Sequence, residues 1–218
     1  MPRKPLIRNN LLPYHVTARA NNREAFVLSM DQNWEIVGRE SLFVSLIYAV
    51  EFQALVLMPN HLHIILTVPQ HDLGIVMNMF MKSVSRTMNL RSGRSGHVFG
   101  ASYHWSLINS SRYFGHALKY VYRNPRRAKL CDRVEDYPFS TLHGLLGRSH
   151  LPFPIHFTRT AMELGLPATE CGHQLDWLNT PFPVEAEHLI QKGLRRKFFQ
   201  AVVDRKTRQP SIPLNGLI

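Results

Sequence analysis

Two apolar, β-rich runs with a Pro-Asn pair between them constrain the fold of this chain more than any other feature. The first run covers residues 52–57, the second covers residues 61–68, and Pro59-Asn60 separates them. Turn residues between two such runs are typical of neighbouring strands, so this segment predicts a hairpin. We therefore expect the chain to build its core around an antiparallel sheet.

Helical and strand-like patterns alternate on both sides of this hairpin. The hydrophobic periodicity predicts strand, helix, strand, strand, helix, strand and helix over residues 13–20, 30–49, 52–57, 61–68, 73–90, 98–107 and 111–124. Ser29 is the expected N-cap of the first helix, and Ser110 or Ser111 that of the third. The third helix should end or kink at Asn124, because Pro125 disfavours helical geometry at the residue before it.

This order of elements, which shows no internal repeat, implies an α+β fold with a single antiparallel β-sheet flanked by α-helices. Residues 1–147 account for that fold. Beyond Gly147, prolines separate short apolar pieces, so we expect residues 148–218 to form a partly helical C-terminal extension. Within it, residues 186–203 form a basic helix candidate that carries Arg195-Arg196-Lys197.

The distribution of charge gives the first indication of a partner. The chain has 26 Lys and Arg residues against 15 Asp and Glu residues, a net charge of +11. Between Lys82 and Arg133 there are eleven basic residues and a single acid, Asp132, so this middle segment carries almost the whole excess. Such a concentration is typical of a site for a polyanion such as a nucleic acid. A solvated basic face without a partner is the alternative.

The sequence also indicates a compartment. Met1-Pro2-Arg3-Lys4-Pro5 lead into polar Asn9-Asn10 and not into the apolar core of a signal peptide. No run of about 18 apolar residues, as a membrane span requires, is present. Cys131 and Cys171 are too few for a disulfide framework. We therefore expect a soluble cytoplasmic protein, associated with the nucleoid if the cell is bacterial, and no membrane partner.

His61-Leu62-His63 stands at the start of a predicted strand. Side chains alternate across a strand, so His61 and His63 face the same way while Leu62 points to the opposite layer. Two imidazoles on one face can share a divalent metal and leave positions for a third ligand. Taken alone, an HxH pair is as often structural as it is metal-binding.

A second pair stands on the third predicted helix. Tyr120 and Asn124 are four residues apart and therefore share one helical face, whereas Tyr122 is turned away from Asn124. A phenol beside a carboxamide, amid Lys119 and several arginines, is an unusual placement. The structural alternative is that Tyr120 packs its ring and Asn124 caps the end of the helix.

Taken together, five segments resemble one family. They are residues 14–23 (Tyr-His-Val-Thr-Ala-Arg-Ala-Asn-Asn-Arg), 58–63 (Met-Pro-Asn-His-Leu-His), 93–99, 120–128 (Tyr-Val-Tyr-Arg-Asn-Pro-Arg-Arg-Ala) and 136–141. In this order and spacing the chain resembles the single-tyrosine HUH transposases, in particular their REP-associated tyrosine transposase branch. The resemblance covers about residues 13–145 and implies a ferredoxin-like palm, whereas residues 150–218 match no family.

The resemblance implies a division of labour among these residues. His61 and His63, with Asn124 as third ligand, would bind Mg or Mn, and Tyr120 would attack a phosphodiester of single-stranded DNA. The products would be a 5′-phosphotyrosine and a free 3′-OH, so strands could be rejoined without ATP. A phenol with an ordinary pKa near 10 is a poor nucleophile at neutral pH, which is why a metal and nearby positive charge are needed.

Basic residues around these motifs are candidates for a DNA groove. Each of them alone is more often a surface or core residue than a specific contact. The candidates are Arg19, Arg23, Lys82, Arg86, Arg91, Arg94, Arg123, Arg126 and Arg127. The expected partner is single-stranded or hairpin DNA, and the protein would act as a monomer or a homodimer.

Three functions therefore remain open at the level of sequence. The first is a metal-dependent DNA endonuclease and strand transferase that acts on hairpin-forming repeats. The second is a non-catalytic DNA or RNA hairpin-binding protein derived from a transposase, although such a protein would not need His61, His63, Tyr120 and Asn124 together. The third, a metal-dependent hydrolase of small phosphoesters, leaves the basic middle segment unexplained.

Overall fold

The computed structural model describes residues 6–156 and 172–199. Its elements in chain order are β1 (Tyr14–Arg19), η1 (Asn21–Arg23), α1 (Met30–Tyr48), β2 (Glu51–Met58), β3 (His61–Thr67), α2 (Leu73–Ser92), β4 (His104–Ile108), α3 (Ser111–Arg127), η2 (Val134–Asp136), α4 (Thr141–Leu145), α6 (Gly172–Asn179), α7 (Val184–Gly193) and β5 (Phe198–Phe199). In these ranges, no helix combines the length and the apolar character of a membrane span.

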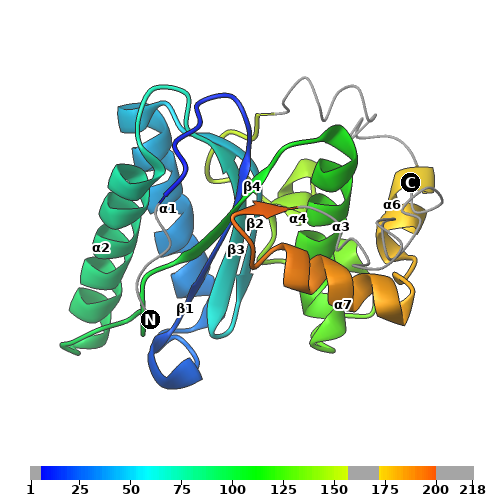
Figure 1. Ribbon diagram of the computed structural model, residues 1–218. Helices are drawn as coiled ribbons and strands as arrows, with labels where there is room; N and C mark the ends of the chain where they lie inside the picture. Colours follow the sequence, from blue (N-terminus) through cyan, green and yellow to red (C-terminus); the bar gives the residue numbers. More distant parts are fainter. Residues whose placement is uncertain (1–5, 157–171, 200–218) are drawn as a thin grey trace.

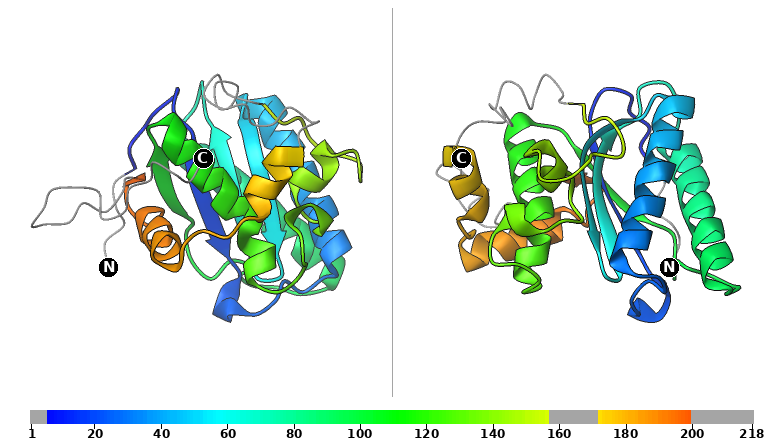
Figure 2. Two further views of the ribbon diagram at one scale, coloured as in Figure 1. Left: turned by 90° about the vertical axis from the view of Figure 1, so that its right-hand side faces the viewer. Right: turned by 180° about the vertical axis from the view of Figure 1, so that it is seen from behind.

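One five-stranded sheet, in the order β2-β3-β1-β4-β5, lies between two helical layers. Helices α1 and α2 cover one face, and α3, α4, α6 and α7 lie on the other (Figures 1 and 2). The predicted α+β class is confirmed, and the first four strands are antiparallel. The sheet is nevertheless mixed, since β5 pairs with β4 in parallel. The expectation of a purely antiparallel sheet was wrong because it counted no strand from the C-terminal extension.

The predicted hairpin and the first two helices are present. β2 and β3 pair in a register that sets Met58 opposite His61, so Pro59-Asn60 forms the turn. Ser29 caps α1 in a capping box with Gln32, in which each residue's side chain meets the other's backbone. The described part of the chain thus places His61 at the first position of β3, directly after the turn.

Of the two outcomes expected at Asn124, an end of the third helix or a kink, the first was wrong. Helix α3 continues through Pro125 to Arg127. Proline has no N–H to donate to the carbonyl of Val121, and the side chain of Asn124 takes over this role. Its Nδ2 donates to Tyr120 O at 2.8 Å and to Val121 O at 3.4 Å. The backbone carbonyls at the proline are therefore satisfied, and the helix ends one turn later.

The C-terminal elements also differ from prediction. Helix α7 ends at Gly193, so Arg195, Arg196 and Lys197 lie beyond it, and the chain extends into β5. Leu107 N of β4 donates to Lys197 O at 2.8 Å, which draws this segment onto the sheet edge. Residues 200–203 of the predicted basic helix lie outside the described residues.

Helices α6 and α7 pack against α3 and not on a separate core. Their apolar side chains join one cluster with those of α3 and the adjoining sheet face: Phe114, Leu118, Val121, Leu178, Phe182, Ala186, Ile190, Leu194 and Phe199. At the opposite edge of the sheet, β2 bonds to later segments, since Leu57 N donates to Phe139 O at 2.9 Å and His156 N donates to Phe52 O at 2.7 Å. The segments that follow α3 thus border both edges of the sheet.

Candidate active site

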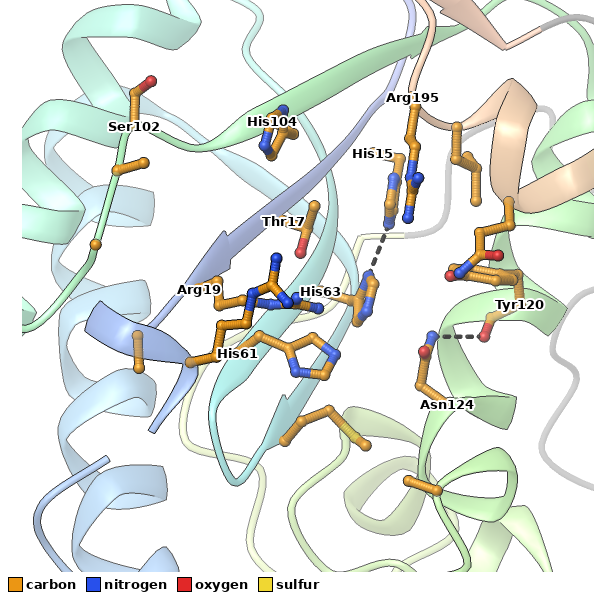
Figure 3. Close-up of a pocket in the computed structure, with 18 of the residues that line it drawn as sticks. His15, Thr17, Arg19, His61, His63, Ser102, His104, Tyr120, Asn124 and Arg195 are labelled. Atoms are coloured by element: carbon orange, nitrogen blue, oxygen red, sulfur yellow. Dashed lines mark hydrogen bonds between the residues drawn. The ribbon is translucent and has the colours of Figure 1, made fainter. Parts of the chain in front are cut away.

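A pocket of about 920 Å³ lies between the sheet and α3. Figure 3 shows the two histidines of β3 on one side of it and Tyr120 and Asn124 on the other. Its lining comprises His15, Thr17, Arg19, Ala20, Asn21, Asn22, Arg23, Met58, His61, His63, Gly100, Ala101, Ser102, His104, Tyr120, Asn124, Arg127, Ala128, Gln191, Leu194 and Arg195. The four residues singled out from the two motifs therefore meet in one cavity of one chain.

Strand alternation explains why these side chains converge. On β3, His61 and His63 face α3, while Leu62 packs into the cluster beneath α1 and α2. β1 sets Thr17 opposite His63 and Arg19 opposite His61, so β1 presents side chains to the same face. The pocket floor is thus built from odd-numbered residues of two adjacent strands.

The tautomer of His61 is fixed by its neighbour in the turn. Asn60 Nδ2 donates to Arg23 O at 2.8 Å, which leaves the amide oxygen of Asn60 to face His61. His61 Nδ1 lies 2.7 Å from that oxygen and must therefore donate to it. The remaining ring nitrogen, Nε2, keeps its lone pair for a ligand.

His63 has a partner that the sequence did not reveal. His15 Nε2 of β1 lies 3.0 Å from His63 Nδ1, and the two rings stack with their centroids 5.2 Å apart. Both side chains are buried. The sequence did carry a signal for this partner. Side chains alternate along a strand, so His15 lies on the same face of β1 as Thr17 and Arg19.

Burial keeps all three imidazoles neutral. It lowers the pKa of His15 to about 3. Burial, with the positive charge of Arg19 as a second cause, lowers the pKa of His61 to about 4. The pKa of His63 is also well below its usual value, first through burial and then through neighbouring positive groups. Neutral imidazoles hold the lone pairs that metal binding requires.

Tyr120 lies against this histidine cluster. Its ring is edge-on to His63 and to His15, with centroid distances of 5.8 and 6.2 Å. The guanidinium of Arg127 lies 5.3 Å from the centroid of the same ring. Tyr122, two residues further along α3, is buried on another side of the helix with its hydroxyl 3.1 Å from Thr141 Oγ1. The helical register expected from the sequence is therefore the one observed.

The donors at the pocket fit a divalent cation. The ring centroids of His61 and His63 lie 5.0 Å apart, which lets both rings reach one ion through metal–nitrogen bonds of about 2.0–2.1 Å. Asn124 uses its amide nitrogen on α3, so its oxygen is the atom that can face a ligand. Across residues 6–156 and 172–199, no group of three or more His, Cys, Asp or Glu side chains is arranged to hold a metal. The three metal donors predicted from the sequence, His61, His63 and Asn124, all line the pocket.

The predicted DNA-binding residues divide into three groups. Arg19, Arg23 and Arg127 line the pocket, the last in an ion pair with Glu187. A second group is not part of the lining and belongs to α2 and the residues after it: Lys82, Arg86, Arg91 and Arg94. α2 lies in the helical layer on the other side of the sheet (Figure 1). Arg91 is in addition bound through both terminal nitrogens to Glu35 of α1, at 2.7 and 2.8 Å.

Arg123 and Arg126 point to α6 and not into the pocket. Arg123 is buried, and its Nη1 donates to Leu178 O at 3.0 Å and to Asn179 O at 2.6 Å. Arg126 Nη1 donates to the same carbonyl of Asn179. These two arginines therefore bind the C-terminal end of α6 to α3, where the negative end of the helix dipole favours positive charge.

Arg195 is a pocket residue that enters from the C-terminal extension. It follows α7, and Figure 3 shows its side chain beside His15. Gln191 and Leu194 of the same region line the pocket with it. The sequence indicated a basic triplet here but not its position, because that position depends on how α7 docks against α3.

Comparison with known proteins identifies the fold. No family model matches the sequence, and no curated protein matches it either. Among solved structures, a REP-associated tyrosine transposase bound to a REP hairpin superposes with a TM-score of 0.59 at 21% identity, over 72% of this chain and 91% of that one. The two chains share a fold. The resemblance to the tyrosine transposase that the sequence motifs indicated is thus present in three dimensions.

A candidate transposase from Deinococcus radiodurans also matches, with a TM-score of 0.38 at 17% identity, over 59% of this chain and 92% of that one. The overlap with the REP-associated transposase leaves more than a quarter of this chain unmatched.

Proposed function

We propose that this protein is a divalent-metal-dependent endonuclease and strand transferase that acts on single-stranded or hairpin-forming DNA, with Tyr120 as nucleophile. The observation that carries the proposal is the position of Tyr120. Its ring lies edge-on to His63 at 5.8 Å, in one pocket with His61 and Asn124 of the same chain. A nucleophile, a metal donor set and positive charge in one cavity are what phosphodiester transfer requires.

The proposed reaction is a transesterification. Tyr120 Oη gives up its proton and attacks the phosphorus, the bond from phosphorus to the 3′-oxygen breaks, and the leaving oxygen takes up a proton to become a free 3′-OH. The phosphoryl group stays on Tyr120 as a 5′-phosphotyrosine, and attack by another 3′-OH reverses the step. A divalent ion, Mg or Mn, held by His61, His63 and Asn124 would polarise the phosphodiester and offset its negative charge.

The arginines at the pocket would hold the substrate. Arg19 and Arg23 line the cavity beside the histidines, and Arg127 contacts the ring of the nucleophile. Their guanidinium groups suit phosphate oxygens, which accept two parallel hydrogen bonds. They would bind the DNA backbone on both sides of the bond that is cut.

The C-terminal extension would take part in binding. In our proposal, residues 1–147 form the catalytic domain and residues 148–218 an extension that contacts DNA through Arg195. The support is the place of Arg195 on the pocket wall, together with Gln191 of α7. A hairpin is the substrate we favour, because the REP-associated transposase of the same fold was solved with a REP hairpin. An enzyme with such a substrate would work in the cytoplasm, at the nucleoid of a bacterium.

A cleavage assay tests the proposal. The full chain is incubated with Mn²⁺ and a labelled oligonucleotide that combines a hairpin with a single-stranded flank, and the products are separated on a denaturing gel. We expect a labelled species that migrates with the protein and disappears on protease treatment. Binding without any adduct, across hairpin substrates and with either metal, would instead support the non-catalytic binding protein. Cleavage without an adduct would support a hydrolase.

A further inference from the structure

His15 is a buried polar residue that the proposed reaction does not use. It is 2% exposed, and its Nδ1 has no hydrogen-bond partner among the residues that the structure describes. A buried polar atom without a partner costs free energy, so its presence calls for a reason. Within the described residues, the side chain of His15 makes one hydrogen bond, the one to His63.

The proton in that hydrogen bond can belong to either ring, and its place decides what His63 offers to the pocket. If His15 donates, His63 accepts through Nδ1 and must carry its own proton on Nε2, which leaves it no lone pair for a metal. If His63 donates from Nδ1, its Nε2 is a bare acceptor. The two arrangements have the same heavy-atom positions and opposite consequences for metal binding.

Two observations favour donation by His63. The neighbouring ligand candidate, His61, already donates from Nδ1 to Asn60, at 2.7 Å, and so keeps its Nε2 bare. The pocket is also lined by the guanidinium groups of Arg19 and Arg127. An N–H of His63 directed into this positive surrounding would be repelled, whereas a lone pair is attracted.

We infer that His15 is a positioning residue for the metal site: His63 Nδ1–H donates to His15 Nε2, which fixes His63 in the tautomer and ring orientation that leave Nε2 ready for a divalent ion. His15 would thus do for His63 what Asn60 does for His61. Partners that hold a ligating imidazole in this way strengthen metal binding about 10- to 100-fold. The inference rests on the proposed function, since it assigns His15 to the site that would hold the ion.

The first test needs no variant and no metal. Long-range ¹H–¹⁵N correlation spectra of the metal-free full chain at pH 7.5 distinguish the two neutral tautomers of each imidazole. We expect His63 and His61 in the form with the proton on Nδ1. A proton on Nε2 of His63 would overturn the inference, because His15 would then compete with the metal for the ring.

The second test measures the affinity for Mn²⁺ alone, by calorimetry. We expect His15→Leu to weaken binding about 10-fold or more, and His15→Gln, whose side-chain oxygen can accept at the place of Nε2, to restore most of it. Ser106→Ala is the matched control, since Ser106 lies opposite His15 on β4, is buried, and its hydroxyl has no hydrogen-bond partner in the described part of the chain. It should leave the affinity unchanged.

The outcomes separate the inference from the proposed function. Wild-type protein that binds no Mn²⁺ contradicts the proposed metal site, whatever the tautomer of His63. Wild-type protein that binds Mn²⁺ as tightly as folded His15→Leu contradicts the role of His15 and leaves the site standing. A loss of Mn²⁺ affinity in His15→Leu that His15→Gln does not restore also counts against the inference, since the loss would then come from altered packing and not from the missing acceptor.

Discussion

The side of the sheet that α1 and α2 cover is filled almost entirely by apolar side chains, whereas the α3 side buries imidazoles, amides and cations. On the first side lie Val16 and Leu62 of the sheet and Phe80 of α2, all fully buried. On the second, Lys119 of α3 is 2% exposed, with its amine 4.9 and 4.8 Å from the ring centroids of Trp177 and Phe182. Within the sheet, the same strands supply both faces, because side chains alternate along each strand.

This contrast separates stability from chemistry. Apolar burial stabilises the fold by about 25 cal/mol per Å² and needs no partners. Buried polar atoms without partners each cost about 1–3 kcal/mol, and most of those in the described chain lie on the α3 face: His15, Gln53, Ser106, His116 and Arg123. The α1 and α2 face would thus stabilise the molecule, while the α3 face would carry the groups that act. Four single substitutions and two double substitutions test this division.

The largest expected effect comes from the α3 face. Tyr120→Phe removes one oxygen and keeps the ring against His15 and His63, so DNA binding and folding should persist. Covalent adduct and strand cleavage should fall at least about 1,000-fold, because the nucleophile is gone. A denaturing gel with labelled single-stranded DNA measures both.

Tyr122→Phe is the matched control on the same helix. It deletes the hydrogen bond to Thr141, so we expect a loss of about 1 kcal/mol in the free energy of unfolding and retained cleavage. An adduct that persists in Tyr120→Phe and vanishes in Tyr122→Phe would show that the nucleophile lies on the other side of α3.

The converse substitution lies on the apolar face. Phe80 of α2 is 0% exposed, and Phe80→Ala should cost about 3–5 kcal/mol in the free energy of unfolding through lost burial and a cavity. Below its unfolding temperature, the variant should bind Mn²⁺ as the wild type does. Denaturant titration and calorimetry give the two values, and a weakened affinity in the folded variant would mean that the two faces are coupled.

His116 tests whether polar burial on the α3 side lowers stability. It is fully buried beside Phe182 of the C-terminal region, and neither ring nitrogen has a partner in the described ranges. His116→Leu should therefore stabilise the protein by about 1–3 kcal/mol. Thermal unfolding at pH 7.5 checks the sign, and destabilisation would indicate that the imidazole has a role in the fold.

The same variant carries a pH signature. Burial lowers the pKa of His116 to about 4, below the ordinary value of 6.5 that the unfolded chain has. Between pH 6.5 and 4 the unfolded state binds the extra proton, so wild-type stability falls as the pH falls through this window. The unfolding temperature of His116→Leu should fall less steeply over that window, and parallel curves would argue against the shift.

The smallest expected effect concerns the salt dependence of DNA affinity, compared between arginines at the pocket and arginines at the end of α2. Each phosphate contact contributes about 0.7 to the slope of log affinity against log salt. Arg19→Ala with Arg23→Ala should lower this slope by about 1.4, since both residues line the pocket. Arg91→Ala with Arg94→Ala should lower it less, because Glu35 already neutralises Arg91. Equal drops would extend the DNA contact to the end of α2.

Sequence reasoning succeeded where a local rule decides the outcome. The turn at Pro59-Asn60, the cap at Ser29 and the shared face of His61 and His63 each follow from a few neighbouring residues, and all three are present. The helical register that turns Tyr122 away from the pocket is of the same kind. Periodicity alone fixes which residues share a face.

It missed one local effect, since Pro125 remains helical because the neighbouring side chain of Asn124 replaces the missing N–H. The other misses depend on a distant partner. Arg123, a DNA-groove candidate by sequence, is buried because the end of α6 supplies carbonyls for it. His15 meets His63 through the register between β1 and β3. Neither of these two contacts can be read from spacing, since each depends on how separate elements dock.

The segments that border the two edges of the sheet have a consequence for assembly. Open edge strands invite pairing with another chain, and proteins commonly suppress this by covering them. Here the outer side of β2 bonds to Phe139 and His156, and the outer side of β4 bears β5. Both edges are thus partly capped by the chain itself. Partial capping of this kind disfavours the joining of two sheets into one, so we expect any contact between copies to use helices or loops.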